Sequence, residues 1–295
     1  MRAEPARKAA MGFRLLLASA LALGLTACPG VHCPTRPFTA AAPALARARV
    51  TREPIRSMSA EARVDQRGTE GRIRGTVLMM LERPGRLRFD AMTQFGPAAV
   101  LTSDGPAFEL LDQREGHFLH GRSCPSNIAR LLGVALSGED LSLLLTGDSP
   151  RLDATNQAIA CTRHGTYLVT LTAADGERQE LEYEVPWADR DVAPEAQHLH
   201  LRRSEQTDVE GHRLFRVTYD DYRDVDIEGG GSVAMPFAIH FVAHGADTLV
   251  RFRHIDVGTA LDAASFQQEA PPGIRSEEVL CDETPPDPAP PPSSE

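Results

Sequence analysis

The sequence predicts a mainly β protein of the α+β class: one antiparallel, incomplete β-barrel of about ten or eleven strands that covers short helices on one face. Three observations predict this fold. Short segments alternate apolar and polar residues with a period of two, glycine-containing turn signals separate them, and the period becomes helical only after residue 122. A wide sheet with one apolar face curls to bury that face.

The region from Gly85 to Gly121 organises the chain. In residues 86–93, Leu87, Phe89 and Ala91 point to one side of a strand while charged residues point to the other. Three more short strands follow, separated by turn signals such as Asp104-Gly105 and Glu115-Gly116, at residues 97–103, 107–112 and 117–120. Together the four strands form an antiparallel meander.

Two amphipathic helices follow the meander. Ser123-Cys124-Pro125 opens the first, because a proline near the first helical position loses no hydrogen bond. Ser137 caps the second, with Asp140 three residues on, and Gly147 ends it. Leucines at helical spacing give both an apolar side, so we expect them to pack on one face of the sheet.

The remaining strands lie on both sides of this region. Two precede the meander, at residues 56–67 and 72–82, and six follow the helices, at residues 166–173, 178–185, 197–205, 212–222, 233–243 and 249–257. In the later strands Phe215, Val217 and Tyr219 share one face. An apolar face that continues through so many strands favours one domain.

Residues 1–27 are typical of a bacterial lipoprotein signal peptide. A basic segment precedes an apolar run at residues 15–25, which is too short to span a membrane. The run ends in Leu25-Thr26-Ala27-Cys28, a lipobox that predicts diacylated Cys28 as the first mature residue. The alternative is an ordinary secretory signal that contains a cysteine. Pro29 and Gly30 offer no acidic retention signal, so we expect an outer-membrane anchor.

The charge excludes several classes of function. Removal of residues 1–27 takes away four positive charges and one negative charge, so the formal charge of −10 becomes −13. Such a chain repels phosphate backbones, and we expect no nucleic-acid partner. Lys8 is the only lysine, so the mature chain has no lysine for a P-loop or a Schiff base.

The mature chain divides into three parts by composition. Residues 28–54 are rich in Pro, Ala and Arg and predict a lipidated tether with one short helix around residues 44–50. Residues 55–281 form the half-barrel domain. Residues 282–295 form a disordered, proline-rich acidic tail.

Several motifs together resemble the lipoprotein-localisation proteins LolA and LolB, most closely the outer-membrane receptor LolB. They are Arg86-Leu-Arg-Phe-Asp90, Phe95-Gly96-Pro97, the helix pair with Leu131-Leu132-Gly133 and residues 141–148, Met235-Pro236, and the ending from Phe266 to Ile274. The resemblance covers roughly residues 56–274. It implies an incomplete barrel whose apolar concave side accommodates acyl chains, and lipid passage from a periplasmic LolA-like carrier to the outer membrane.

An apolar sheet face under helices also predicts an acyl-chain site from the residues themselves. The alternative is a core that these side chains fill completely. The candidate cavity residues are Met79, Leu87, Phe89, Phe108, Leu131, Leu132, Leu141, Leu144, Leu145, Phe237 and Phe241. The resemblance adds Phe95 as an exposed membrane-delivery residue; the alternative is that it packs under its own turn.

Enzymatic and metal chemistry find little support. There is no His-Glu-x-x-His, Gly-x-Ser-x-Gly or phosphate-binding loop, so we expect no catalytic residues and no cofactor. His198 and His200 alternate with leucines and are expected to face solvent rather than bind metal. The run from Asp224 to Gly229 begins like a calcium loop, but Met235 stands where a bidentate glutamate is required.

Four cysteines remain beyond Cys28. In an oxidising envelope they predict disulfides, and four cysteines allow three pairings. We favour Cys124 with Cys161, and Cys33 with Cys281; free buried thiols are the alternative.

The sequence therefore predicts a monomeric, lipid-anchored envelope protein, in the outer membrane and facing the periplasm, that binds acyl chains of lipoproteins and assists their transfer. The alternative is a non-catalytic structural or interaction lipoprotein with the same fold and a filled cavity. An exposed apolar loop tip would distinguish the two.

Overall fold

A computed structural model describes residues 32–68, 71–133, 135–243 and 245–282. The predicted signal peptide, the lipidation site Cys28 and nearly all of the predicted tail lie outside these residues. The compact unit that begins at Cys33 carries the fold. Its strands are β1 (Ser57–Gly68), β2 (Gly71–Glu82), β3 (Arg86–Thr93), β4 (Gly96–Ser103), β5 (Ala107–Asp112), β6 (His117–Arg122), β7 (Asn156–Cys161), β8 (Tyr167–Thr172), β9 (Arg178–Glu184), β10 (His200–Thr207), β11 (Arg213–Asp226), β12 (Ser232–Ala243), β13 (Ala246–Val257) and β14 (Arg275–Val279).

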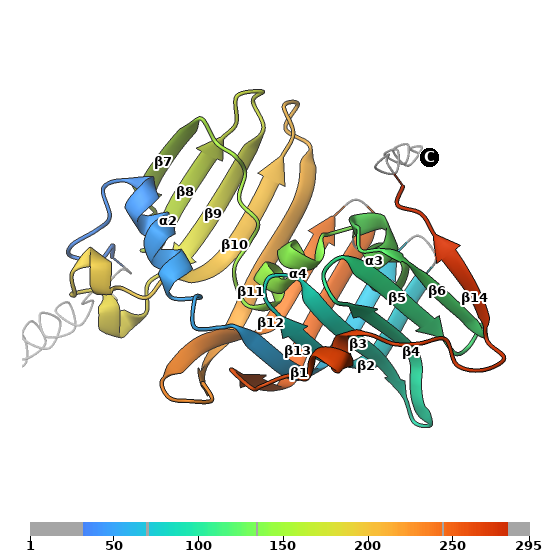
Figure 1. The fold of residues 1–295 in the computed structure, drawn as a ribbon. Helices are drawn as coiled ribbons and strands as arrows, with labels where there is room; N and C mark the ends of the chain where they lie inside the picture. Colours follow the sequence, from blue (N-terminus) through green and yellow to red (C-terminus); the bar gives the residue numbers. More distant parts are fainter. Residues whose placement is uncertain (1–31, 69–70, 134, 244, 283–295) are drawn as a thin grey trace, which may run out of the picture. The chain divides into compact units, whose positions relative to one another are not determined.

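All these strands belong to one open sheet of 14 strands in the order β14-β6-β5-β4-β3-β2-β1-β13-β12-β11-β10-β9-β8-β7 (Figure 1). Every neighbouring pair is antiparallel except β14 and β6, which are parallel. The expectation of a mainly β fold with helices on one face is confirmed. The predicted antiparallel arrangement is correct for every neighbouring pair except β14 and β6. The expected count of ten or eleven strands is too low, and the predicted segments omit β7 and β14 at the two edges of the sheet.

Alternation along the strands builds the core as predicted. On β3, Leu87 and Phe89 are buried, while Arg88 between them and Asp90 after them are half-buried. The same period buries Tyr167, Val169 and Leu171 on β8. Each strand thus contributes one apolar face, which is the pattern that drives a sheet to bury one side.

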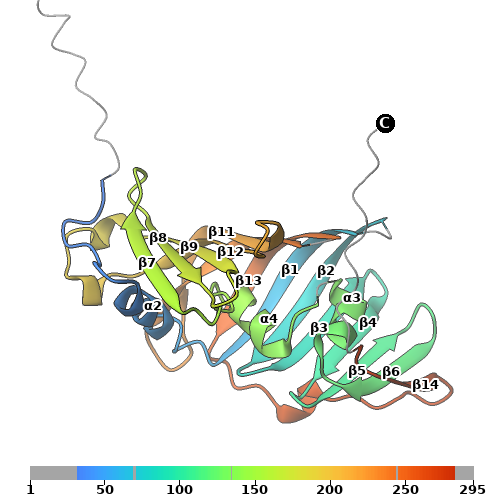
Figure 2. The same cartoon turned by 90° about the horizontal axis from the view of Figure 1, so that it is seen from above.

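The two predicted helices are α3 (Pro125–Leu132) and α4 (Gly138–Leu145), and they lie against the strands from β3 to β5 (Figures 1 and 2). Pro125 opens α3, and Gly133 ends it in the left-handed conformation with φ of 65°. The side chain of Ser137 accepts a hydrogen bond from the Asp140 N–H at the start of α4, as predicted.

Residues 33–54 are not a tether, which corrects the sequence prediction. They carry helix α2 (Ala41–Val50), which contacts β7 and buries Ala44 and Leu45. Phe38 before the helix is also buried, and its ring meets the ring of Tyr167 edge to face at 5.7 Å between centroids. The predicted helix is present but starts earlier, because alanines at helical spacing let it lie close to the sheet.

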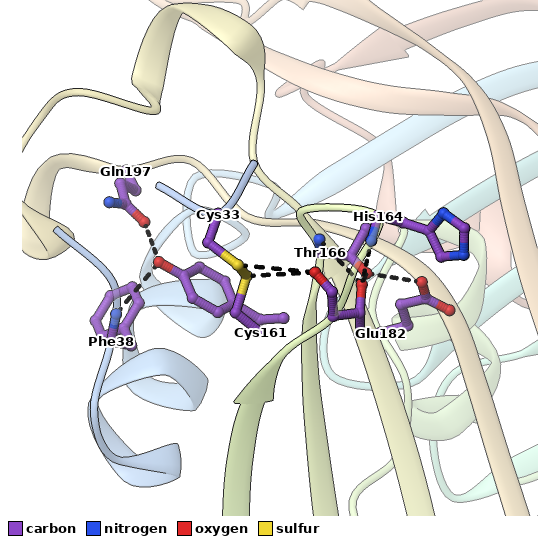
Figure 3. Close-up of a disulfide and its surroundings, with 9 residues drawn as sticks. Cys33, Phe38, Cys161, His164, Thr166, Glu182 and Gln197 are labelled. Atoms are coloured by element: carbon purple, nitrogen blue, oxygen red, sulfur yellow. Dashed lines mark hydrogen bonds between the residues drawn. A yellow bond between two sulfur atoms is a disulfide. The ribbon is translucent and has the colours of Figure 1, made fainter. Parts of the chain in front are cut away.

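Two disulfides are present, but their pairing differs from the one favoured above. Cys33 is bonded to Cys161, and Cys124 to Cys281. The first joins the N-terminal segment to the end of β7 (Figure 3). The second joins the residue before α3 to the segment after β14. The physical reason is topological: β14 pairs with β6, which brings the end of the domain beside the start of α3.

His200 is less exposed than its alternation with leucines predicts. Its ring stacks on Tyr222 of β11, with 4.4 Å between ring centroids, whereas His198 is exposed and hydrogen-bonded to Asp189. Burial, together with the nearby positive charge of Arg52, lowers the pKa of His200 to about 4. The expectation that both histidines face solvent is therefore wrong for His200.

The lowered pKa of His200 predicts that the protein loses stability in acid. In the unfolded chain its pKa is about 6.5. Between pH 6.5 and 4 the unfolded chain therefore binds a proton that the folded chain does not bind, and the free energy of unfolding decreases as pH falls through this window. We expect a loss of at most about 3 kcal/mol. Arg52, His198 and Arg202 oppose protonation, while Asp189 favours it.

Urea denaturation at pH 7 and pH 4.5 measures the effect. His200→Gln should decrease the stability difference between the two pH values, and His254→Gln at an exposed position serves as the comparison. An identical pH dependence in the wild type and His200→Gln would contradict the assignment.

Candidate functional site

A cavity of about 510 Å³ lies between the two helices and the sheet. This volume falls within the range of ligand-binding pockets. Eight strands supply its wall, namely β1, β2, β3, β4, β5, β11, β12 and β13. The turn after β5, the helices and the segment between them supply the rest. Most of its surface is apolar, so it is suited to a hydrocarbon chain rather than to a polar metabolite.

Most of the predicted cavity residues lie on this wall. The lining includes Met79, Phe89, Leu131, Leu132, Leu141, Leu144, Leu145 and Phe241. Three predicted residues, Leu87, Phe108 and Phe237, are buried elsewhere. Phe237 is covered by the guanidinium group of Arg223, 4.3 Å from the ring centre. Leu87 packs close to Gly138 at the start of α4, so the helix covers it.

Seven branched aliphatic lining residues were not predicted: Val64, Ile73, Val77, Leu136, Val217, Ile239 and Val250. All but Leu136, which lies between α3 and α4, are on strands, where periodicity could have found them. Val77 pairs with Ala91 across β2 and β3, and Ile239 is two residues from Phe241 on β12. Each therefore shares a sheet face with a residue on the cavity wall.

Polar residues gather at one end of the cavity. Among them are Gln66, Thr248 and Asp112. Gln66 of β1 pairs with Thr248 of β13 and with Ile73 of β2, and Asp112 of β5 pairs with Ala99 of β4. The strand register thus places all three near the same end of the sheet. The carboxylate of Asp112 accepts hydrogen bonds from two backbone N–H groups of its turn, at 2.8 and 3.1 Å. An apolar interior with a polar rim is the arrangement that an amphiphile requires.

Phe95 lies beside this rim in the β3–β4 turn. Its side chain is 91% exposed, which excludes the alternative that it packs under its own turn. Thr93 fixes the turn, because its hydroxyl accepts a hydrogen bond from the Phe95 N–H and donates one to the Gly96 carbonyl. Thr93 also lines the cavity. An exposed aromatic ring thus stands next to the polar rim of the cavity.

Helix α4 is fixed to the sheet at both ends. At its start a Cβ on Gly138 would lie 2.8 Å from the Gly85 carbonyl oxygen, so only glycine allows this approach. At its end the Arg83 guanidinium group donates a 2.6 Å hydrogen bond to Thr146, and Tyr219 donates one of 2.5 Å to the Asp148 carbonyl. Burial lowers the pKa of Arg83. These polar contacts hold α4 against the sheet. In α3, by contrast, the lining residues Leu131 and Leu132 are only half-buried.

Sequence reasoning did not find the buried polar groups behind this end of α4. Arg52 is buried and donates to the Ala234 carbonyl, and Arg151 forms a 3.2 Å ion pair with Asp148. Arg52 is far in sequence from Asp148 and Arg151, and none of the three belongs to a repeated pattern. Local patterns in the sequence therefore do not connect them. Their partners become apparent only in the folded chain.

Within the described residues, one group of three side chains could hold a metal ion: Asp208, Glu210 and His212, whose ligand atoms lie within 4.8 Å of one another. They lie in the hairpin between β10 and β11, and His212 is already hydrogen-bonded to Asp208. We assign no metal site to them. Asp224 and Asp226 lie on strand β11, which differs from the loop that a calcium site requires.

Helices in the described part of the chain lack the combination of length and apolarity needed to cross a bilayer. No protein-family model and no curated relative matches the sequence. The structure is similar to a DUF1329 family protein from Desulfovibrio piger, with a TM-score of 0.49 and 12% identity over 78% of this chain and 98% of that chain.

Two further solved structures are similar. One is a LolA superfamily protein from Nitrosomonas europaea, with a TM-score of 0.47 and 11% identity over 78% of this chain and 99% of that chain. The other is a putative outer membrane lipoprotein-sorting protein domain from Vibrio parahaemolyticus, with a TM-score of 0.40 and 12% identity over 76% of this chain and 94% of that chain. These are distant likenesses.

Proposed function

We propose that this protein is a lipid-anchored envelope protein that binds acyl chains of lipoproteins in the cavity under α3 and α4 and assists their transfer or insertion into the outer membrane. The observation that carries the proposal is the cavity itself. Its volume of about 510 Å³ is not filled by the protein's own side chains, although a filled core was the alternative. Each methylene that a ligand buries there contributes about 0.8 kcal/mol.

The exposed ring of Phe95 supports the transfer step. A large apolar side chain in water is unfavourable unless it meets an apolar partner, and a bilayer provides one. Its place beside the cavity rim suits a residue that contacts the membrane while the acyl chains leave. A structural lipoprotein with the same fold would need neither the exposed ring nor the unfilled cavity.

The anchor and the partners complete the proposal. Acyl chains on Cys28 hold the protein on the periplasmic side of the outer membrane, since two or more chains make such attachment stable. The donor would be a periplasmic carrier of the LolA type, and the protein acts as a monomer. It needs no cofactor, and its cavity residues bind and release lipid without a chemical step.

Native mass spectrometry tests the cavity directly. The full chain with Cys28→Ser is expressed in a Gram-negative periplasm and analysed for co-purifying acyl ligands, then for uptake of an added acyl probe. Leu144→Asp is expected to decrease binding at least about 10-fold, because it places a charge on the apolar wall.

Leu143→Asp is the matched control, because this neighbouring leucine on α4 is half-buried and does not line the cavity. Circular dichroism and thermal unfolding verify that both variants fold. If the Cys28→Ser chain without further substitution has a bare mass and takes up no probe, the acyl-binding proposal is wrong and the structural alternative stands.

A further inference from the structure

The first mature residue and the folded domain are separated by a very short segment. Cys33 is bonded to Cys161 at the end of β7, only five residues after Cys28. Five residues span at most about 17 Å even when fully extended. If Cys28 is acylated, the Cys33–Cys161 end of the domain must therefore stay close to the bilayer surface.

The residues that follow Cys33 are also fixed to this end of the domain. The Phe38 N–H donates a 3.2 Å hydrogen bond to the Tyr167 hydroxyl, and the Gln197 side chain donates one of 3.0 Å to the Arg36 carbonyl. Figure 3 shows Phe38 and Gln197 beside the disulfide. The short segment therefore cannot be lengthened by release of residues 33–38 without breaking a buried network.

An exposed tryptophan lies in the same region. Trp187 opens the short helix η2 (Trp187–Asp189), and its side chain is 80% exposed. The N–H of Thr35 donates a 2.9 Å hydrogen bond to the carbonyl of Arg190, so this segment lies beside the N-terminal one. The Arg190 guanidinium group stands over the indole ring at 5.4 Å. Tryptophan with a neighbouring arginine is typical of the membrane interface, where the ring is half in lipid and its N–H remains solvated.

We propose that Trp187 docks on the bilayer that holds the Cys28 acyl chains, and that this contact orients the domain on the membrane. The proposal rests on the lipid anchor of the proposed function, but it is independent of the cavity. The occupant of the surface is a phospholipid interface, because the length of chain between Cys28 and Cys33 leaves the bilayer as the nearest large apolar surface. A protein partner would instead leave Trp187 accessible in pure lipid vesicles.

The docked orientation is compatible with membrane contact by Phe95. Trp187 follows β9, and β9 and β3 are seven positions apart in the sheet, about 34 Å at roughly 4.8 Å per strand. A domain whose sheet lies along the bilayer can present both regions to it. The two contacts are then separate and can be tested one at a time.

Trp187 is the only tryptophan in the chain, so its fluorescence reports this contact alone. The full acylated protein is reconstituted in vesicles of phosphatidylethanolamine and phosphatidylglycerol, with mass spectrometry to verify the lipid on Cys28. We expect emission at shorter wavelength than in the soluble Cys28→Ser chain, and about a twofold decrease in quenching by acrylamide. A flexible Gly-Ser insertion after Gly30 should reverse much of this change, because a longer linker decreases the effective concentration.

The proposal would be overturned if Trp187 of the vesicle-bound protein emits at the same wavelength, and is quenched by acrylamide to the same extent, as in the soluble chain. A mature chain without lipid on Cys28 would also overturn it. A second reporter separates this result from the proposed function. In the Trp187→Phe background, Phe95→Trp reports the delivery loop, and acyl-probe uptake reports the cavity. Protection of Trp187 without acyl uptake would support docking while rejecting acyl binding.

Discussion

Replacing Ala91 with tryptophan is expected to lower the affinity for acyl chains by about 100-fold or more while the domain remains folded. Ala91 lies on β3 between Val77 of β2 and Ala99 of β4, and all three line the cavity. An indole at this position occupies volume that a ligand would otherwise use. Exclusion of about four methylenes costs about 3 kcal/mol of binding energy, which corresponds to roughly 100-fold.

Leu78→Trp is the matched control for this experiment. Leu78 precedes Met79 on β2, is 38% exposed, and pairs with Asp90, so it lies on the opposite sheet face from Ala91. It introduces the same ring on a neighbouring strand but outside the cavity. Titration with a fluorescent acyl probe measures affinity, and thermal unfolding measures stability. Equal affinity of Ala91→Trp and the control would show that acyl chains bind elsewhere.

Local periodicity predicted the strands that have one buried face and missed the two at the sheet edges. In β7, apolar and polar residues do not alternate along the strand. In β14, four of the five residues are exposed. Edge strands need only one hydrogen-bonded neighbour and bury little, so they leave a weak trace in the sequence. The parallel pairing of β14 with β6 is non-local and has no local signature.

Helix α2 could have been recognised as part of the domain. Its buried residues Ala41, Ala44, Leu45 and Ala48 have the spacing of one helix face. The composition of residues 28–54 suggested a tether because alanine contributes little apolarity. Small residues nevertheless allow close approach of a helix to a sheet, and burial of Phe38 and Leu45 then adds apolar contact.

The candidate site was predictable as a set of residues but not as a cavity. Leucine spacing in α3 and α4 identified the helical wall, and alternation identified several strand residues. The packing of the helices on the sheet decides whether side chains fill the apolar space. That packing depends on close contacts such as the one between Gly138 and Gly85. Disulfide pairing was beyond local reasoning for the same reason, since Cys33 and Cys161 are 128 residues apart.

Removing the Cys33–Cys161 disulfide with Cys33→Ser and Cys161→Ser is expected to lower the free energy of unfolding by about 2–5 kcal/mol. The bond closes a loop of 128 residues, and a link of this length restricts the unfolded chain strongly. Loss of this disulfide also frees the segment from Cys33 to α2. The contacts of this segment and α2 with the sheet then depend on Phe38 and a few small side chains. Urea denaturation without reductant measures the change.

The second disulfide provides the comparison that separates these two effects. Cys124→Ser with Cys281→Ser removes a loop of 157 residues, so the effect on the unfolded chain is similar. It frees β14, however, most of whose residues are exposed. Hydrogen exchange should therefore show faster exchange in α2 only after loss of Cys33–Cys161, and in β14 only after loss of Cys124–Cys281. Unchanged exchange in α2 without the first disulfide would mean that packing alone holds the N-terminal segment. The linker from Cys28 would then remain short without the covalent bond.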